Sequence, residues 1–202
     1  MTVGAPNLVL IETTRERNQV EVAALYVRAD GPYQGMAGVD AWDIDRDATT
    51  FAGCGPVVAH PPCGAWGRYA HVYGGDDKHC GPIAVRQVRA WGGVLEHPAD
   101  TKLWTHCGLP KPGEPADLAG GWTLAADQGW WGHAAPKATW LYLVGIRPDL
   151  VPLAATECQW WRTPLGRCER MSKRQRELSP PAFARFLVAL ARTAAPGQAL
   201  QW

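Results

Sequence analysis

Short apolar runs that end abruptly at proline most limit how this chain can fold. Gly55–His60 stops at Pro61-Pro62, and Val94–His97 stops at Pro98. Proline lacks a backbone N–H and fixes its own φ, so each run can form only a few residues of buried strand before the chain must turn. The apolar run Val22–Val27 has the same length and predicts a further buried strand.

Helical patterns alternate with these strands. Ile83–Trp91 carries apolar residues at helical spacing, and Ser179 before Pro180-Pro181 is typical of a helix start. Two more strands are predicted at Gly38–Asp43 and Thr139–Ile146. Short strands alternating with helices predict an α/β fold with a mostly parallel sheet. A length of 202 residues, with 22 glycines and 17 prolines, predicts one loop-rich domain spanning residues 1–202.

Chemically active side chains gather where the predicted strands end. They are Asp43 and Asp45, then Cys63, then Glu96 with His97. In sheets of this class, ligands bind at the carboxyl ends of the strands. We therefore expect these residues to share one rim of the sheet.

Cys63 directly follows Pro61 and Pro62. The two prolines stiffen the loop, so the thiol is held in place. A nucleophilic thiol also needs a lowered pKa, and His60 and Arg68 are nearby sources of positive charge. The alternative is a small buried hydrophobic residue in a proline turn.

Glu96 offers a carboxyl group at the end of another predicted strand. A carboxylic acid in a dry pocket has a raised pKa and can donate a proton. A thiolate and such an acid suit chemistry on a pyrimidine, because the thiolate adds to C6 while the acid hydrogen-bonds N3, and C5 then accepts a one-carbon unit. The alternative for Glu96 is an exposed carboxylate at a strand end.

The segment Pro61-Pro62-Cys63 resembles the nucleophile loop of the DNA cytosine-C5 methyltransferases, and Glu96 resembles the glutamate of that family's second catalytic motif. Gln128–Gly145, with a lysine before an apolar strand, and Arg176–Leu190 are similar to later segments of the family, in the same order. The similarity spans about residues 55–190. The whole pattern is also similar to small methyltransferase-like proteins encoded by bacteriophages, and it implies a Rossmann/methyltransferase-like fold.

The resemblance implies an enzyme that transfers a one-carbon unit to C5 of a pyrimidine, with S-adenosylmethionine or another one-carbon donor as cofactor. The substrate would be a base in DNA, single-stranded or flipped out of the duplex, or a nucleotide. Cys63 and Glu96 would be catalytic, and Asp43 or Asp45 would hold the ribose of the cofactor. Residues expected to contact the substrate are His60, Pro62, Trp66, Arg68, His97 and Lys137.

The sequence departs from the family in three places. A glycine-rich cofactor loop near the N-terminus is not visible, and His97 stands where the family has asparagine after its glutamate. Only residues 146–171 remain where a DNA-recognition domain is expected. We therefore expect a reduced enzyme of the methyltransferase kind, without a separate sequence-reading domain.

Charge and hydropathy limit the classes of partner that the chain can bind. A net charge of +1 excludes a global basic footprint for nucleic acid, although the basic segment 157–177 could contact phosphate. The longest apolar stretch is far too short to span a bilayer, and no targeting segment is visible. We expect no membrane partner and a cytoplasmic location, in a bacterial or phage-infected cell.

Two other functions remain open: a non-catalytic nucleic-acid-binding or inhibitory relative, and a base- or nucleotide-processing hydrolase or glycosyl transferase that uses Glu96 or Asp43. Of the 11 tryptophans, we expect Trp66 to line the site and most others to lie in the core. The spacing of the histidines and cysteines is poor for zinc, so we expect no metal site. The possible ligands are His79-Cys80, His106-Cys107, Cys158 and Cys168.

Overall fold

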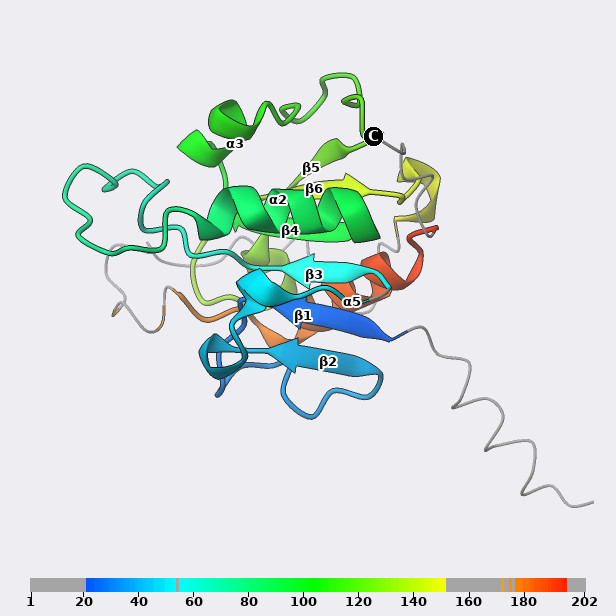
Figure 1. Ribbon diagram of the computed structural model, residues 1–202, viewed down its shortest axis with the longest axis horizontal. Helices are drawn as coiled ribbons and strands as arrows, with labels where there is room; N and C mark the ends of the chain where they lie inside the picture. The colour runs from blue at the N-terminus through cyan, green and yellow to red at the C-terminus, as the bar shows by residue number, and fades with distance from the viewer. Residues whose placement is uncertain (1–20, 54, 152–171, 173–174, 176, 196–202) are drawn as a thin grey trace, which may run out of the picture.

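The computed structural model describes residues 21–53, 55–151, 172, 175 and 177–195. Six strands form one sheet in the order β2-β1-β3-β4-β6-β5 (Figure 1). The strands are β1 (Val22–Leu25), β2 (Val39–Trp42), β3 (Val57–Ala59), β4 (Gly93–Pro98), β5 (Trp122–Asp127) and β6 (Ala138–Val144). Most of the basic segment 157–177 lies outside the described residues.

Four neighbouring strands of the sheet are parallel, and a hairpin completes it. β2, β1, β3 and β4 pair in parallel, whereas β6 is antiparallel to both β4 and β5. The expected α/β fold with a mostly parallel sheet is therefore confirmed. From β1 the chain moves outward to β2 and then returns to the other side of β1 as β3. Such a reversal of strand order is a topological switch point, where α/β proteins form ligand sites at the carboxyl ends of the strands.

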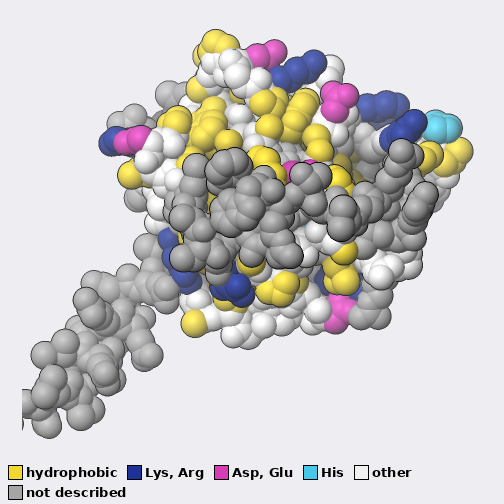
Figure 2. All heavy atoms as spheres, turned by 180° about the vertical axis from the view of Figure 1, so that it is seen from behind, with side chains coloured by type: hydrophobic (Ala, Val, Ile, Leu, Met, Phe, Trp, Pro, Cys, Tyr) yellow, Lys and Arg dark blue, Asp and Glu magenta, His cyan; other side chains and the backbone are white. Residues whose placement is uncertain are grey.

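Helices cover both faces of the sheet. Helix α2 (Cys80–Trp91) lies in front of the sheet in Figure 1 and α5 (Pro181–Arg192) behind it, while α3 (Lys102–Cys107) follows β4. Because side chains alternate along a strand, Val58 and Val94 pack on the α5 side. Their neighbours Val57 and Leu95 pack on the α2 side. Hydrophobic side chains also gather on the described part of the surface seen from behind (Figure 2). Short 3-10 helices occur at Ile44–Arg46, Ala48–Thr50, Gln128–Trp131 and Pro148–Leu150.

The expected strands and helices form at their predicted places, with bounds that differ by a few residues. The sequence analysis missed β5 and α3. Trp122–Asp127 shows no clean alternation of buried and exposed residues, and α3 has only six residues, too few for a periodic pattern. The residue that caps α5 is Pro180, not Ser179 as predicted. Within the described part of the chain, no helix is long and apolar enough to cross a membrane.

Gly93 at the start of β4 permits the close pairing of β4 with β3. Its φ is 113°, and a Cβ atom there would lie 2.0 Å from the carbonyl oxygen of Val57. We expect Gly93→Ala to lower the free energy of unfolding by more than about 3 kcal/mol, because the two central strands would have to separate. Gly92→Ala is the matched control. Gly92 also has a positive φ, 73°, but its nearest neighbour would lie at 3.4 Å, so a loss of about 1–2 kcal/mol is expected. Equal losses in equilibrium urea unfolding would contradict this account of the pairing.

Candidate functional site

Glu96 lies near the carboxyl end of β4 and is the centre of a buried hydrogen-bond network. Its side chain accepts hydrogen bonds at both carboxylate oxygens. His60, the first residue after β3, lies 2.9 Å from Oε2 through its Nδ1 atom. Gln128 Nε2 donates to Oε1 at 3.0 Å, and the hydroxyl of Thr139 on β6 donates to the same oxygen. The network therefore joins the ends of β3, β4 and the β5–β6 hairpin.

The imidazole of His60 connects Glu96 to the loop after β1. Its Nε2 atom lies 2.7 Å from the hydroxyl of Tyr33, which is 3% exposed. A carboxylate only accepts hydrogen bonds, so Nδ1 of His60 carries the proton shared with Glu96. In the neutral imidazole, Nε2 then accepts from the Tyr33 hydroxyl. Tyr33, His60 and Glu96 thus form a continuous chain of hydrogen bonds across the switch point.

The network holds Glu96 as a carboxylate, contrary to the expectation of a raised pKa. Burial alone would raise the pKa. The hydrogen bond and charge of His60, the charge of Lys137 and the hydrogen bond from Thr139 together outweigh burial and lower the pKa of Glu96 to about 2. Glu96 is therefore a hydrogen-bond acceptor at neutral pH and not a standing proton donor.

His97 lies on the opposite face of the sheet from Glu96, because successive strand residues point to opposite sides. It is fully buried, its Nδ1 atom lies 2.9 Å from Thr101 Oγ1, and its ring lies 6.3 Å from that of Trp104. Burial lowers the pKa of His97 to about 4, so the ring is neutral at neutral pH. The structure does not bring this predicted substrate contact to the same face as Glu96.

The loop after β3 passes from one face of the sheet to the other. It begins with His60 on the Glu96 side and reaches Trp66, which is buried in the α2-side core. Cys63 lies between them and is exposed. Its carbonyl accepts hydrogen bonds from the backbone N–H groups of Trp66 and Gly67, at 3.1 and 2.8 Å. This turn fixes the position of Cys63 above the carboxyl edge.

The electrostatic surroundings of Cys63 differ from the expectation of a lowered thiol pKa. Protein atoms around the sulfur desolvate it, and the charge of Glu96 acts in the same direction, so the pKa of Cys63 is raised. Lys137 opposes this shift, and Glu177 adds to it. Both Glu96 and Lys137 therefore act on the thiol through their charge. Arg68, expected to supply positive charge, is exposed and is not among the groups that shift this pKa.

A cavity of about 750 Å³ lies beside this network, between the loop after β1 and the start of α5. We call it the α5 pocket, and Gly31-Pro32, Trp131, His133 and Leu178 are among its lining residues. The indole N–H of Trp131 and Nε2 of His133 are buried there without a hydrogen-bond partner among the described residues. Lys137 Nζ donates to the carbonyl of Leu178 at 3.1 Å. The α5 pocket thus adjoins the lysine that acts on Cys63 and Glu96, and its size suits a ligand as large as a nucleoside.

The predicted cofactor residues Asp43 and Asp45 lie after β2 at a 3-10 turn, where Asp43 accepts the backbone N–H of Asp45. Neither of them lines the α5 pocket. Pro62, expected beside the substrate, directly precedes Cys63 and is partly buried. In the described ranges, no group of three or more histidine, cysteine or acidic side chains could hold a metal ion. Cys158 and Cys168 lie outside those ranges.

Sequence reasoning missed three residues that hold the site together: Tyr33, Gln128 and Thr139. Tyr33 follows the Gly31-Pro32 break by one residue, and nothing local marks it as a partner of His60. Gln128 and Thr139 belong to the stretch that resembles the methyltransferases, but their role depends on the pairing of β6 with β4. That register places Thr139 opposite Pro98, two residues beyond Glu96.

Comparison with known proteins found no match to a family model, to a curated protein or to a solved structure.

The buried His97 makes stability depend on pH. The folded protein holds its pKa near 4 against an ordinary value of 6.5, so the unfolded chain binds this proton first as the pH falls. We expect the free energy of unfolding to fall by about 3 kcal/mol between pH 7 and pH 4. The lowered pKa of Glu96 affects the free energy of unfolding mainly below the ordinary value of 4.5, so its effect can be separated from that of His97. In urea unfolding, His97→Asn should remove most of the loss between pH 7 and 4.5. An unchanged pH dependence would contradict the assignment.

The raised pKa of Cys63 predicts slow alkylation. At pH 8 we expect iodoacetamide to modify this thiol more slowly than an ordinary cysteine, with a rate that still rises with pH above 9. Glu96→Gln removes a nearby negative charge and should speed the reaction about threefold or more. Glu114→Gln, at an exposed glutamate, is the control. Peptide mass spectrometry assigns the modified residue, and a slower reaction in Glu96→Gln would refute the proximity of the two groups.

Proposed function

We propose that this chain is an enzyme that modifies a pyrimidine base at C5 through transient addition of Cys63, in the manner of the DNA cytosine-C5 methyltransferases. The observation that carries the proposal is the parallel pairing of β3 with β4, which brings the Cys63 loop after β3 and Glu96 near the end of β4 to the same edge of the sheet. The cysteine and the glutamate are 33 residues apart in the sequence and come from neighbouring parallel strands. A doubly wound core of the methyltransferase kind accounts for this placement, because it collects strand ends at the switch point.

The proposed reaction begins at the thiol. The Cys63 thiol gives up its proton to solvent, and its sulfur forms a bond to C6 of the pyrimidine. The electron pair of the C5–C6 double bond moves to C5, and N3 takes up a proton from water. C5 then forms a bond to the one-carbon group, and the bond between that group and its donor breaks, with the electron pair staying on the donor. Loss of the C5 proton to water and of the N3 proton expels the sulfur and restores the double bond.

Glu96 supports this sequence as a carboxylate. Oε1 accepts from Gln128 and Thr139, whereas the hydrogen bond found at Oε2 among the described residues comes from His60. A carboxylate oxygen has two acceptor positions, so Oε2 can also accept a hydrogen bond from the N3–H group once the ring is protonated. His60, fixed between Tyr33 and Glu96, is a positioning residue that keeps this oxygen in place.

The α5 pocket suits the methyl donor. Its volume fits a nucleoside-sized molecule, and the unpartnered indole N–H of Trp131 would meet an acceptor atom of such a ligand. Nδ1 of His133 donates to the carbonyl of Ala135, so in the neutral ring the unpartnered Nε2 would accept a hydrogen bond from the ligand. When bound, S-adenosylmethionine supplies an electrophilic methyl group. Asp43 and Asp45 lie outside the lining of this pocket, so we assign the binding to the loop after β1 and to the start of α5 instead.

A non-catalytic nucleic-acid-binding role is the second candidate. The raised pKa of Cys63 favours it, because a protonated thiol is a poor nucleophile. The hydrolase and glycosyl-transferase alternative is less favoured, because Glu96 with a pKa of about 2 cannot act as a general acid near neutrality.

Trapping with 5-fluoropyrimidines tests the proposal. A fluorine at C5 blocks the proton loss that releases the enzyme, so the protein should remain covalently joined to its substrate. The probes are a single-stranded oligonucleotide with 5-fluoro-2′-deoxycytidine and the free 5-fluoro nucleotide, each with and without S-adenosylmethionine. We expect a denaturation-resistant adduct at Cys63, and an adduct rate about 100-fold lower in Glu96→Gln. Denaturing electrophoresis and mass spectrometry measure both.

Matched variants make the result specific. Cys63→Ala should abolish the adduct, whereas Cys107→Ser, at a half-buried free cysteine, should leave it unchanged. Binding of the oligonucleotide without any adduct would support the non-catalytic alternative. Absence of an adduct with every probe, with and without the methyl donor, would overturn the proposed chemistry.

A further inference from the structure

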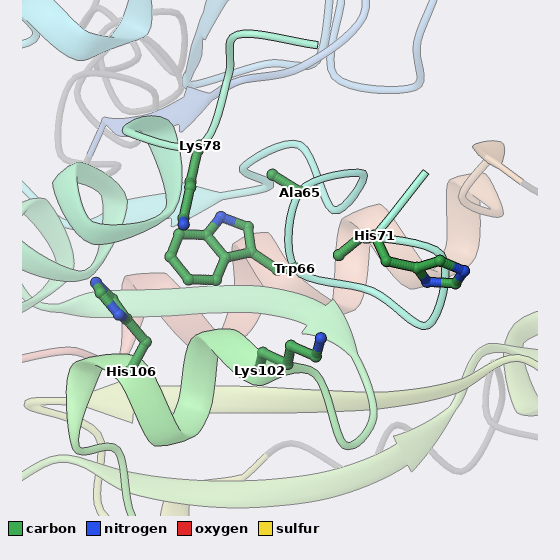
Figure 3. A pocket seen from close by; sticks show the side chains of 7 residues that line it. Ala65, Trp66, His71, Lys78, Lys102 and His106 are labelled. Atoms are coloured by element: carbon green, nitrogen blue, oxygen red, sulfur yellow. The ribbon is translucent and has the colours of Figure 1, made fainter. Parts of the chain in front are cut away.

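A second cavity, of about 340 Å³, opens on the other face of the sheet edge, next to the Cys63 loop. We call it the Trp66 pocket. The indole of Trp66 forms one wall, with Lys78 and His106 on one side of it in Figure 3. Lys102 and His71 complete the polar lining. Neither the Glu96 network nor the α5 pocket uses any of these side chains.

The polar side chains that line the pocket come from three segments of the chain. Lys102 and His106 are four residues apart on α3, so they share one side of that helix. The backbone N–H of Lys102 donates to the carbonyl of Trp66 at 3.0 Å, which joins α3 to the Cys63 loop. Lys78 lies with its ammonium nitrogen 5.6 Å from the centre of the Trp66 ring. His71 comes from the loop between Trp66 and α2.

Charge in the pocket has one sign. Two lysines and two histidines line it, and no aspartate or glutamate is among the lining residues. Asp77, the neighbour of Lys78, accepts a hydrogen bond from the Tyr73 hydroxyl at 2.9 Å. Among the described residues, neither lysine is paired with a carboxylate. Ammonium groups only donate, so the matching ligand is an anion with several acceptor oxygens.

The Trp66 wall of the pocket is held in place by its contact with α2. Trp66 is 3% exposed, and its indole N–H has no hydrogen-bond partner within the described residues. It packs against the first turn of α2, where a Cβ on Gly81 would lie 2.8 Å from the indole nitrogen. The amino end of a helix carries a partial positive charge and adds to the attraction for an anion. The volume exceeds that of a small ion and leaves room for an attached sugar.

We propose that the Trp66 pocket binds a phosphate group of the pyrimidine substrate. The identity of the substrate rests on the proposed function, whereas the preference for phosphate rests on the pocket alone. The backbone turn from Cys63 to Trp66 links the two places, so a base held at Cys63 would have its own or a neighbouring phosphate within reach of Lys78 and Lys102. The chain as a whole has a net charge of only +1, so this local cluster gives the attraction that overall charge does not.

Binding measurements with charge variants test the proposal. The probe is a fluorescein-labelled single-stranded oligodeoxycytidine. Its binding to the protein is measured by fluorescence anisotropy at several salt concentrations. Lys78 and Lys102 are both exposed, so their replacement leaves the core intact. We expect the double variant Lys78→Ala/Lys102→Ala to bind about tenfold more weakly or worse, with a salt dependence reduced by about one to two ions. Lys111→Ala, at an exposed lysine outside the pocket, should bind as the wild type. The charge-preserving Lys78→Arg/Lys102→Arg should recover most of the affinity.

Competition separates the two sources of phosphate. If deoxycytidine monophosphate displaces the oligonucleotide and deoxycytidine does not, the pocket takes a nucleotide phosphate. If neither displaces it, while the lysine variants still weaken binding, the pocket takes the phosphodiester backbone. The phosphate site would be overturned if the double alanine variant bound the oligonucleotide and deoxycytidine monophosphate with wild-type affinity. Lysine-dependent binding without a Cys63 adduct would support the phosphate site and refute the C5 chemistry. Adduct formation at the wild-type rate in the double alanine variant would support the C5 chemistry and refute the phosphate site.

Discussion

The buried carboxylate of Glu96 is the constraint on which the rest of the site depends. A charge removed from water is costly unless hydrogen bonds and opposite charge replace the lost solvation. His60, Gln128 and Thr139 supply those hydrogen bonds, and Lys137 supplies charge. These partners come from the end of β3 and from the β5–β6 hairpin, so the strands must pair in this register for the carboxylate to remain buried. The antiparallel hairpin on a parallel sheet thus helps to hold the carboxylate on which the proposed chemistry depends.

Strand alternation divides the carboxyl edge into two sides. Glu96 points toward the α5 face and His97 toward the α2 face, and the Cys63 loop crosses between them. The network of carboxylate and imidazole lies on the first side with the α5 pocket. The cationic Trp66 pocket lies on the second. One loop of seven residues, from His60 to Trp66, therefore contacts both sides. The two prolines in this loop restrict its backbone and so limit how the two sides can move relative to each other.

The parts of the fold that follow local rules could be predicted from the sequence. The prolines and glycines that interrupt the apolar runs located β3 and β4, and the helical spacing of apolar residues located α2 and α5. The shared rim of Cys63 and Glu96 followed from the general position of sites in parallel sheets. The partners of Glu96 could not be predicted, because they depend on the antiparallel register of β6, and neither could the pKa shifts. Glu96 and Cys63 both shift against expectation, because burial and neighbours act together and only three-dimensional distances determine which effect is larger.

In the proposed reaction, the same carboxylate that orders the site also opposes the nucleophile. Burial raises the pKa of the Cys63 thiol, and the charge of ionised Glu96 raises it further, so the thiol stays protonated in the free protein at neutral pH. A pyrimidine ring that takes up a proton at N3 and hydrogen-bonds Oε2 would offset that charge, and the thiol pKa would then fall. Activation of the thiol would thus follow occupation of the site by a base. An arrangement of this kind keeps the exposed sulfur unreactive until a substrate is bound, which a permanently lowered pKa would not do.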